Sequence, residues 1–566
     1  MSDPAFDGLT PWPEAMVEQY CRAGIWGEEN LAEWLEARLT ARAQELVLSG
    51  PGFAGTAWQE LTGAELLQQI GQMAGGLSQL GLVRGDRVVL QMGNSNAFLI
   101  TLFALFTLGV IPVLALPGHR RREIEHFIRL TNARAWLASA SDAGMDFREL
   151  GTQLRAAIPA LEHIFIDTQD AGPHRALANL LNGACGGRNT SLATGQRVDP
   201  AGIALLLCSG GTTGLPKLIP RTHRDYLYNA AASAAVCGMG PDDCYLVALP
   251  AAHNFPLACP GLLGALNAGA RIAMCPAPSP EIAFGCIARA QATVTALVPP
   301  LVRVWLDYAA EFAAPPECLR LLQVGGARLD AGTARRIRPE LGCALQQVFG
   351  MAEGLLNYTR AQDPDVLVQS TQGCPLSPFD EIRIVDADGI DVPPGKRGEL
   401  WTRGPYTLRG YYKAEEANRR SFTDDGYYRS GDLVRQLSTG HLVVEGRIRE
   451  VIRRGAETVS VEALEALLAQ LDAVKDVAVV GLPCERLGEQ VCAVLVLADR
   501  SAPKPTLSDV RAFLIEEGIA RFMLPDSLEF VAQVPLTAVG KIARQQLITH
   551  IQQSRKNSES QGVSLL

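Results

Sequence analysis

From about residue 60 onward the chain alternates between helix-like and strand-like patterns of apolar residues. Over residues 61–82 the apolar positions recur with helical spacing, at Leu66, Ile70, Met73 and Leu77. Residues 87–90 then form a short apolar run that is typical of a buried strand, and another helix–strand pair follows. Repeated alternation of this kind predicts an α/β fold with mainly parallel sheets.

One uncharged run, residues 98–117, is long enough to span a bilayer. Gly109, Pro112 and Pro117 divide it into a helix-sized piece and a strand-sized piece, residues 110–116. A buried helix that leads into a buried strand explains this pattern, because parallel strands are covered on both faces. We therefore expect no membrane span.

The later part of the chain has a different pattern. Residues 381–386 and 398–403 are short strand-like runs separated by Asp-Gly and Pro-Gly turns, which predicts a smaller β-rich module. A domain boundary is expected near Gly446-Arg447.

Beyond that boundary the pattern predicts a helix at 461–471, strands at 477–480 and 491–497, and a helix at 507–517. Such an order is typical of a small α+β domain. We expect an N-terminal domain over residues 1–447 and a C-terminal domain over 448–550. The remaining residues, 551–566, are expected to form a disordered tail, because residues 552–562 are polar and rich in small side chains.

Composition narrows the functional classes. The 566 residues are 48% hydrophobic and 20% charged, which is typical of a soluble globular protein, and the net charge is −9. No overall basic field is present to hold nucleic acid or an anionic membrane, so neither partner is expected. Thirteen cysteines occur without a C-x-x-C pair, and the start of the chain lacks the pattern of a secretory signal. Reduced, buried thiols and a cytoplasmic location are expected.

The segment Ser209-Gly210-Gly211-Thr212-Thr213-Gly214-Leu215-Pro216-Lys217 directly follows an apolar run at 203–207. Its glycines expose backbone N–H groups, its hydroxyls add donors, and a lysine ends it, as a polyphosphate cradle requires. It is not a Walker A loop, because Lys217 follows a proline and precedes a leucine. A plain surface turn is the alternative, but strands of this kind rarely open into so many hydroxyls.

With this loop, the chain resembles the adenylate-forming superfamily of acyl- and aryl-CoA synthetases, luciferases and peptide-synthetase adenylation domains. Further segments agree in the family's order: Gln346 to Glu353, Gly398-Glu399-Leu400, Arg403-Gly404-Pro405, Tyr428 to Asp432, Gly446-Arg447 and Pro535 to Lys541. The resemblance covers about residues 50–550. It implies a large N-terminal domain, built of α/β subdomains and a small β-rich subdomain, and a smaller mobile α+β C-terminal domain.

The resemblance also implies ATP as cosubstrate and assigns residues to its parts. The phosphates would lie on Ser209, Gly210, Gly211, Thr212, Thr213 and Lys217. Adenine would lie along Gly325, Gly326 and Ala327, with Phe349 against its face. The ribose hydroxyls would bind Asp432, helped by Arg447. An aromatic face suits a purine, and a carboxylate suits a vicinal diol.

Two further charged residues receive roles by resemblance. Glu353 would hold Mg²⁺, a hard cation that binds a carboxylate together with substrate phosphate oxygens. Lys541 would be the adenylation lysine, which neutralises charge as the carboxylate attacks the α-phosphorus and pyrophosphate leaves. Taken alone, either residue would more often be an ordinary surface charge.

The segment that begins at Ala252-His253-Asn254-Phe255 is similar to that of the subgroup that activates hydroxylated benzoic acids for siderophores. Asn254 has an amide that can bond an ortho-hydroxyl, and Phe255 offers an apolar wall to a ring. By resemblance, His253 borders the carboxylate and the pantetheine path; a satisfied core histidine is the alternative.

Two pocket positions bear on the choice of acid. Cys259 stands where enzymes for 2,3-dihydroxybenzoate commonly have Ser and those for salicylate typically have Cys. Leu356 is bulkier than the Val common in the dihydroxybenzoate group. Both changes make the pocket smaller and drier near ring position 3, which favours salicylate. Ordinary core packing is the alternative explanation for both residues.

Some positions depart from the subgroup's pattern. Ala456 and Thr458 stand where a glycine and a lysine are usual, in a loop that lines the pantetheine tunnel in the family. An added Cβ can obstruct a close backbone approach. Arg449 occupies the hinge position, where Asp or Lys is more usual. These departures concern the second half-reaction rather than adenylation.

The sequence therefore predicts a stand-alone aryl-acid–AMP ligase that loads a phosphopantetheinylated aryl carrier protein in trans. A 2,3-dihydroxybenzoate-AMP ligase and an aryl-CoA ligase are the alternatives within the superfamily. Arg453 and Arg454 are available for the 3′-phosphate of coenzyme A. A non-catalytic ATP-binding sensor is the remote alternative, against which Lys541, Glu353 and Asp432 argue.

Overall fold

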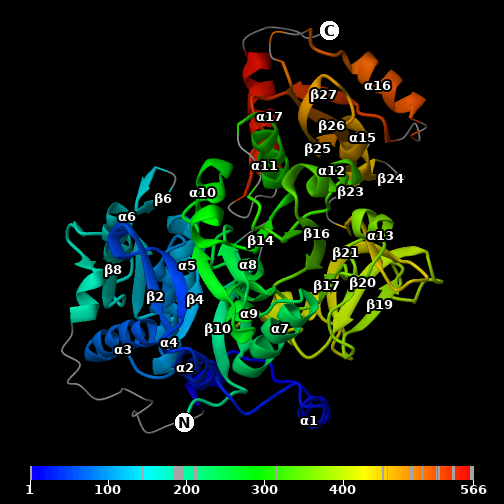
Figure 1. Cartoon of the computed structure of the whole chain (residues 1–566). Coiled ribbons are helices and arrows are strands. Elements are labelled where there is room, and N and C mark those ends of the chain that lie inside the picture. The colour runs from blue at the N-terminus through cyan, green and yellow to red at the C-terminus, as the bar shows by residue number, and fades with distance from the viewer. Residues whose placement is uncertain are drawn as a thin grey trace. The chain divides into compact units, whose positions relative to one another are not determined.

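The computed structural model of the chain describes residues 3–142, 144–182, 197–209, 215–312, 316–448, 451–454, 457–484, 488–499, 501, 503–517, 519, 523–537 and 542–560 (Figure 1). The chain divides into two compact units. The first comprises residues 1–211, 215–382 and 402–428, and the second comprises 212–214, 383–401 and 429–566. The boundary predicted at residue 447 stays a prediction.

The first unit contains two large sheets. Within the described residues, the nine-stranded sheet has the order β18 (Cys374–Pro375), β17 (Leu356–Tyr358), β16 (Ala344–Gly350), β15 (Leu321–Gly325), β14 (Val294–Leu297), β12 (Cys244–Val247), β13 (Arg271–Met274), β1 (Leu46–Pro51), β2 (Trp58–Thr62). The strands from β16 to β1 pair in parallel, whereas β17, β18 and β2 add antiparallel edges.

The second large sheet is seven-stranded in the described part of the chain. Its order is β11 (Leu218–Thr222), β10 (Ile203–Cys208), β4 (Ile111–Leu114), β3 (Arg87–Gln91), β5 (Ala135–Ser139), β8 (His163–Asp167), β9 (Arg175–Ala176). Every pair in it is parallel except β10 with β11, which form an antiparallel hairpin. The mainly parallel α/β architecture predicted from the alternating pattern is confirmed.

Helices surround these sheets, as the blue-to-green part of Figure 1 shows. The described helices of the first unit are α1 (Glu14–Arg22), α2 (Leu31–Ala41), α3 (Gly63–Gln79), α4 (Asn96–Leu108), α5 (Arg121–Thr131), α6 (Phe147–Ala157), α7 (His223–Val236), α8 (Asn254–Ala258), α9 (Gly261–Asn267), α10 (Pro280–Ala290), α11 (Pro299–Glu311), α12 (Ala331–Leu341), α13 (Asp365–Ser370) and α14 (Glu415–Ser421). A short hairpin is formed by β6 (Ser141–Asp142) and β7 (Met145–Asp146). Helices α10, α11 and α12 share one buried cluster with the nine-stranded sheet, and α5 and α6 share another with the seven-stranded sheet.

The uncharged run at 98–117 folds as the pattern predicts. Helix α4 is buried along most of its length, and the Ser95 hydroxyl caps its start by accepting from the backbone N–H of Phe98 at 3.2 Å. Gly109 ends it with a left-handed φ of 66°, and strand β4 follows. Among the described residues, no helix is both long and apolar enough to cross a membrane.

The second unit contains a four-stranded sheet in its described part, with the order β19 (Glu381–Val385), β20 (Arg397–Arg403), β21 (Tyr428–Gln436), β22 (Leu442–Arg447). A further sheet has the order β24 (Glu457–Ser460), β23 (Val451–Arg454), β26 (Gly488–Leu497), β25 (Val474–Cys484), with β27 (Ser527–Phe530) also paired to β26. Its helices are α15 (Val461–Leu468), α16 (Leu507–Glu516) and α17 (Arg544–Ser560). Both the β-rich module and the α+β portion predicted from the pattern are present.

Helix α17 corrects the expectation of a disordered tail over residues 551–560. Leu547 and Ile551, one helical turn apart, are buried against β25. Arg555 forms an ion pair with Glu529 at 2.9 Å and also donates to the Ser527 hydroxyl. Two apolar positions at helical spacing therefore hold a segment whose composition is polar. The expectation for residues 561–566 lies outside the described residues.

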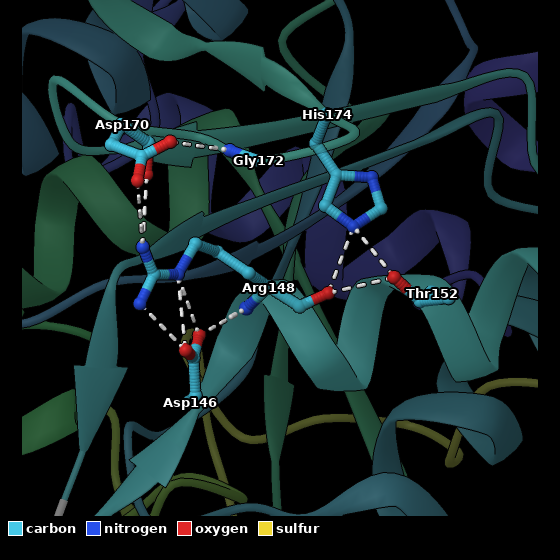
Figure 2. A network of polar contacts seen from close by, with 6 residues as sticks. All are labelled: Asp146, Arg148, Thr152, Asp170, Gly172 and His174. Carbon is cyan, nitrogen blue, oxygen red and sulfur yellow. Dashed lines mark hydrogen bonds and ion pairs between the residues drawn. The ribbon is translucent and has the colours of Figure 1, made fainter.

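A polar network lies beside edge strand β9 of the seven-stranded sheet, between helix α6 and the segment that joins β8 to β9 (Figure 2). Figure 2 shows its members, Asp146, Arg148, Thr152, Asp170, Gly172 and His174. Asp146 caps helix α6, accepting from the backbone N–H of Arg148 at 2.8 Å and from its guanidinium, which lowers the pKa of the carboxyl. His174 Nε2 donates to the carbonyl of Arg148 at 2.9 Å and so attaches the segment between β8 and β9 to helix α6. These contacts join helix α6 to the segment between β8 and β9, so we assign the network to structure (Figure 2).

None of the described cysteines forms a disulfide, and seven of these twelve are buried, whereas five are partly exposed. Several lie in the cluster between the nine-stranded sheet and its helices, among them Cys244, Cys286 and Cys343.

His223 supplies a pH-sensitive contact in this fold. It is the first residue of α7, it is buried, and its Nδ1 accepts from the backbone N–H of Leu31 at 3.1 Å, at the start of α2. Burial lowers the pKa of His223 to about 3. Protonation would convert this acceptor into a donor that faces another donor.

We therefore expect His223 to stabilise the fold fully above about pH 6.5, and this contribution to be lost as the pH falls toward about 3, by about 1.4 kcal/mol per pH unit. His223→Asn keeps an acceptor near the Nδ1 position but does not titrate. Urea unfolding at several pH values should give a flatter acid slope for this variant. The exposed His550→Asn should keep the wild-type slope, and an unchanged slope in His223→Asn would contradict the assignment.

Candidate active site

The predicted phosphate loop is the connection of the β10–β11 hairpin. Its two ends are tied together, because the Ser209 N–H donates to the carbonyl of Lys217 at 2.8 Å and the Lys217 N–H donates to the Ser209 hydroxyl at 2.9 Å. Ser209 is buried. Gly210, Gly211, Thr212 and Thr213 lie outside the described residues. These two hydrogen bonds hold the first and last residues of the predicted loop, Ser209 and Lys217, next to each other.

Glu353 lies between strands β16 and β17 and is partly exposed. Its Oε1 accepts from the Tyr411 hydroxyl at 2.9 Å, and the ammonium of Lys217 lies 4.1 Å from the centroid of the Tyr411 ring. The structure thus brings the predicted metal carboxylate and the loop lysine to opposite parts of one tyrosine. The sequence analysis did not single out Tyr411.

The donor set around Glu353 fits a nucleotide-bound Mg²⁺ rather than a metal cage. No group of three or more His, Cys, Asp or Glu side chains gathers at a metal-binding distance in the described part of the chain. Mg²⁺ commonly takes one or two carboxylates from the protein and completes its shell with phosphate oxygens and water. The carboxylate of Glu353, which shares Tyr411 as a neighbour with Lys217 of the predicted phosphate loop, is compatible with that arrangement.

The predicted adenine residues lie at the carboxyl ends of two neighbouring parallel strands. Gly325 ends β15 and pairs in register with Val348 of β16, and Phe349 follows on β16. A Cβ at Gly325 would lie 2.7 Å from the Val348 carbonyl and 3.1 Å from the ring of Phe255, so only glycine fits there. Gly326 has a φ of +83°, and Ala327 is the next residue. Carboxyl ends of parallel strands are where α/β proteins commonly bind ligands.

His253 and Asn254 begin the short helix α8. His253 is its N-cap, and its Nδ1 accepts from the backbone N–H of Phe255 at 3.2 Å, which fixes the ring near the helix start. The His253 side chain is partly exposed, whereas Asn254 and Phe255 are buried.

Asn254 is held from two sides. Its Oδ1 accepts from the Tyr226 hydroxyl at 2.9 Å, and its Nδ2 donates to the Cys259 sulfur at 3.4 Å. The Cys259 thiol in turn donates to the carbonyl of Asn254 at 3.4 Å, and burial raises the pKa of this thiol to about 12. Cys259 is therefore a neutral thiol that contacts the side chain and the backbone of the predicted acid-binding asparagine.

Tyr226 connects this pocket with the Glu353 segment through a buried arginine. The guanidinium of Arg221 lies 4.8 Å from the centroid of the Tyr226 ring and pairs with Asp225 at 2.8 Å. Arg221 also donates to the carbonyl of Ala352 at 3.2 Å, next to Glu353. Sequence reasoning missed Tyr226 and Arg221, although the Thr222–Asp225 capping box does mark the start of helix α7, which carries Tyr226, directly after the strand that carries Arg221.

Leu356 lies on β17, opposite Gly350 of β16, and is buried. A Cβ at Gly350 would clash with Leu356 Cδ2, so the leucine packs directly on the backbone of the neighbouring strand. That contact accounts for the packing of Leu356, and the role in substrate choice stays a prediction.

In the second unit, Asp432 of β21 pairs in register with Arg447 of β22. The guanidinium Nε of Arg447 donates to Asp432 Oδ1 at 2.6 Å, and Asp432 is buried while Arg447 is partly exposed. The two residues predicted to act on the ribose thus form one ion pair. Lys541, Arg449 and Ala456 lie outside the described residues, as does the side chain of Thr458.

With this geometry in place, comparison with known proteins identifies the class. The family described as AMP-binding enzyme matches residues 36–412, and the AMP-binding enzyme C-terminal domain matches residues 463–541. The chain belongs to the AMP-binding enzyme family and has the α/β fold of the adenylate-forming ligases. The resemblance stated from the sequence is confirmed.

Particular relatives refine the comparison. The chain is 45% identical to the salicyl-AMP ligase / salicyl-S-ArCP synthetase of Mycobacterium tuberculosis, over 97% of this chain and 95% of the relative. It is 43% identical to the 2,3-dihydroxybenzoate-AMP ligase of Bacillus subtilis, over 95% and 97%. The apo structure of Mycobacterium smegmatis MbtA matches with a TM-score of 0.74 and 44% identity, over 97% of this chain and all of that one (100%).

The Tyr226–Asn254 contact predicts a measurable stability effect. Tyr226→Phe keeps the ring but leaves the buried amide oxygen of Asn254 without its donor, and an unsatisfied buried polar group costs about 1–3 kcal/mol. We expect the free energy of unfolding, measured by urea titration, to fall by that amount.

Tyr308→Phe is the matched control, because no described hydrogen bond depends on the Tyr308 hydroxyl; its effect should stay within about 0.5 kcal/mol. Equal effects of the two substitutions would show that the Tyr226 hydroxyl is not needed to satisfy Asn254.

Proposed function

We propose that this enzyme activates an aromatic acid with an ortho-hydroxyl group, above all salicylate, by transferring AMP from ATP to the carboxylate. The two curated relatives named above are named for salicylate and for 2,3-dihydroxybenzoate, and both acids carry that ortho-hydroxyl. The pathway implied is siderophore synthesis, in the cytoplasm.

The orientation of Asn254 is the observation that carries the choice of substrate class. Because Tyr226 occupies the amide oxygen, the amide presents its N–H side. One of these N–H bonds is directed to Cys259, and the other is suited to donate to an ortho-hydroxyl oxygen of the acid. The ring of Phe255, beside Gly325, supplies the apolar wall for the aromatic ring.

In the proposed first step, a carboxylate oxygen forms a bond to the α-phosphorus of ATP. The bond from that phosphorus to the bridging oxygen breaks, and pyrophosphate leaves with the electron pair. Ser209 to Lys217 would hold the phosphates, Lys541 would neutralise charge where the two anions meet, and Glu353 would hold Mg²⁺. When bound, Mg²⁺ would offset the negative charge of the phosphates.

The other nucleotide contacts are proposed from the same resemblance. Adenine would lie on Gly325, Gly326 and Ala327, against the face of Phe349. The ribose hydroxyls would bind the carboxylate of Asp432, which Arg447 holds in place through their ion pair.

In the proposed second step, the phosphopantetheine sulfur of an aryl carrier protein attacks the acyl carbon of the aryl adenylate. A thioester forms, AMP leaves, and the thiol proton is lost. We place His253 at the border of this path. Free coenzyme A is the competing acceptor, and parallel assays with holo-carrier protein and with coenzyme A distinguish the two: thioester formed only with coenzyme A would assign an aryl-CoA ligase.

The choice of acid is tested by ATP–pyrophosphate exchange with salicylate, 2,3-dihydroxybenzoate and benzoate. The wild-type enzyme should prefer salicylate in kcat/KM. Cys259→Ser with Leu356→Val adds a hydroxyl partner and removes bulk, and should shift the ratio toward the dihydroxy acid by about 1–3 kcal/mol, roughly ten- to a hundredfold. Asn254→Ala should weaken both hydroxy acids.

Cys343→Ser makes the same chemical change in a core cluster of the same unit and should leave the ratio unchanged. A wild-type preference for the dihydroxy acid, or an unaltered ratio in the double variant, would rule out the salicylate assignment while leaving adenylation intact.

The role of Lys541 is tested with the same assay. Because this lysine would act on charge that develops in the transition state, Lys541→Ala should lower acid-dependent exchange by about a hundredfold or more while the protein stays folded. Lys475→Ala removes the same charge from an exposed position in the same unit and serves as the control. Exchange within a few-fold of wild type in Lys541→Ala would refute the role.

A further inference from the structure

Three polar groups of the first unit converge on Tyr411, which is buried. Its hydroxyl lies 2.9 Å from Glu353 Oε1 and 2.9 Å from the Tyr428 hydroxyl. The ammonium of Lys217 lies over its ring, 4.1 Å from the centroid. Two of these partners have roles in the proposed function: Glu353 would bind Mg²⁺, and Lys217 would bind the phosphates.

The directions of the hydrogen bonds follow from the chemistry of the groups. Tyr411 has a single O–H proton, and a carboxylate oxygen can only accept, so that proton belongs to the bond with Glu353. Tyr428 must then donate to the Tyr411 oxygen. A tyrosine hydroxyl has an ordinary pKa of about 10, so it carries its proton near neutral pH and can donate.

The backbone around Tyr411 is fastened as well. The Asn418 side chain accepts from the Tyr411 N–H at 2.7 Å and donates to the Tyr411 carbonyl at 3.0 Å. Three residues earlier, the Leu408 N–H donates to the carbonyl of Glu353 at 2.8 Å. The tyrosine is therefore attached to Glu353 through both side chain and backbone, and its ring has little freedom to move.

The result is a carboxylate with one oxygen occupied. Tyr411 holds Oε1 of Glu353, and in the described part of the chain no hydrogen bond to Oε2 is found. A carboxylate arranged in this way can offer one oxygen to a cation, while a fixed ring face holds the nearby lysine.

We propose that Tyr411 is a positioning residue for the metal–phosphate end of the nucleotide site: its hydroxyl orients Glu353 toward Mg²⁺, and its ring orients Lys217 toward the phosphates. This inference rests on the proposed function, because it takes from there the roles of Glu353 and Lys217. It adds a residue that couples the two.

The test separates the hydroxyl from the ring. Tyr411→Phe keeps the ring under Lys217 and loses only the bond to Glu353. We expect the Mg²⁺ concentration for half-maximal stabilisation of the protein by ATP, measured as a shift in Tm without any acid, to rise about 10- to 100-fold. At saturating Mg²⁺, ATP should still stabilise this variant as it does wild type.

Tyr412→Phe is the matched control. Tyr412 is also buried, and its hydroxyl accepts from Arg87 rather than contacting Glu353. Its Mg²⁺ requirement should stay within about twofold of wild type. Tyr411→Leu, which removes the ring too, should also weaken ATP at saturating Mg²⁺.

Glu353→Gln completes a double-mutant cycle with Tyr411→Phe. It should raise the Mg²⁺ requirement by itself, and adding Tyr411→Phe should then have little further effect, since the carboxylate to be oriented is gone. An unchanged requirement in Tyr411→Phe or in Glu353→Gln, or full additivity in the double variant, would overturn the inference. Because the Tm assay contains no acid, a wild-type enzyme that exchanges with no aryl acid would refute the proposed function and leave this test standing.

Discussion

Two opposite charges lie inside the first unit with almost no access to solvent. The Arg221 and Asp225 side chains are each 1% exposed and pair at 2.8 Å. A buried ion that loses its partner costs about 3–5 kcal/mol, so everything around such a pair must keep its place. Arg221 meets this demand with the Asp225 carboxylate, the carbonyl of Ala352 and the ring face of Tyr226.

Those contacts determine where the chemistry can occur. Arg221 belongs to β11, directly after the predicted phosphate loop, and its partners belong to helix α7 and to the segment that carries Glu353. One guanidinium therefore sets the distance between the loop, the predicted metal carboxylate and Tyr226. Through Tyr226 the same constraint reaches Asn254, whose amide orientation underlies the proposed choice of acid. Stability and the proposed recognition of the acid would then depend on the same buried group.

Much of the fold could be predicted from the sequence, because its elements depend on local signals. In the apolar run at 98–117, Gly109 and the prolines mark where the helix ends and the strand lies, and helix α4 and strand β4 have these limits. The glycine- and threonine-rich segment before Lys217 predicts a phosphate loop by its composition, and that role stays a prediction. What could not be predicted depends on pairing across long separations, such as Tyr411 with Glu353 and Tyr226 with Asn254. A tyrosine in a helix or loop has no periodicity that shows which distant carboxylate or amide it will meet. Helix α17 was missed for a related reason: its burial depends on Leu547 and Ile551 within a polar stretch.

Under the proposed function, selectivity between the two acids would come from Cys259, a residue that offers no hydrogen bond to the acid. The Cys259 thiol is neutral, donates to the carbonyl of Asn254 and accepts from the Asn254 amide, so both of its weak hydrogen-bonding capacities are used inside the protein. A ring hydroxyl brought next to it would lose water and gain only a sulfur contact, whereas a serine hydroxyl could reorient to accept it. An acid that places no hydroxyl there loses nothing. Under this proposal, a buried thiol that is already satisfied would discriminate by withholding a hydrogen bond, and this would require the surrounding network of Tyr226 and Arg221 to remain rigid.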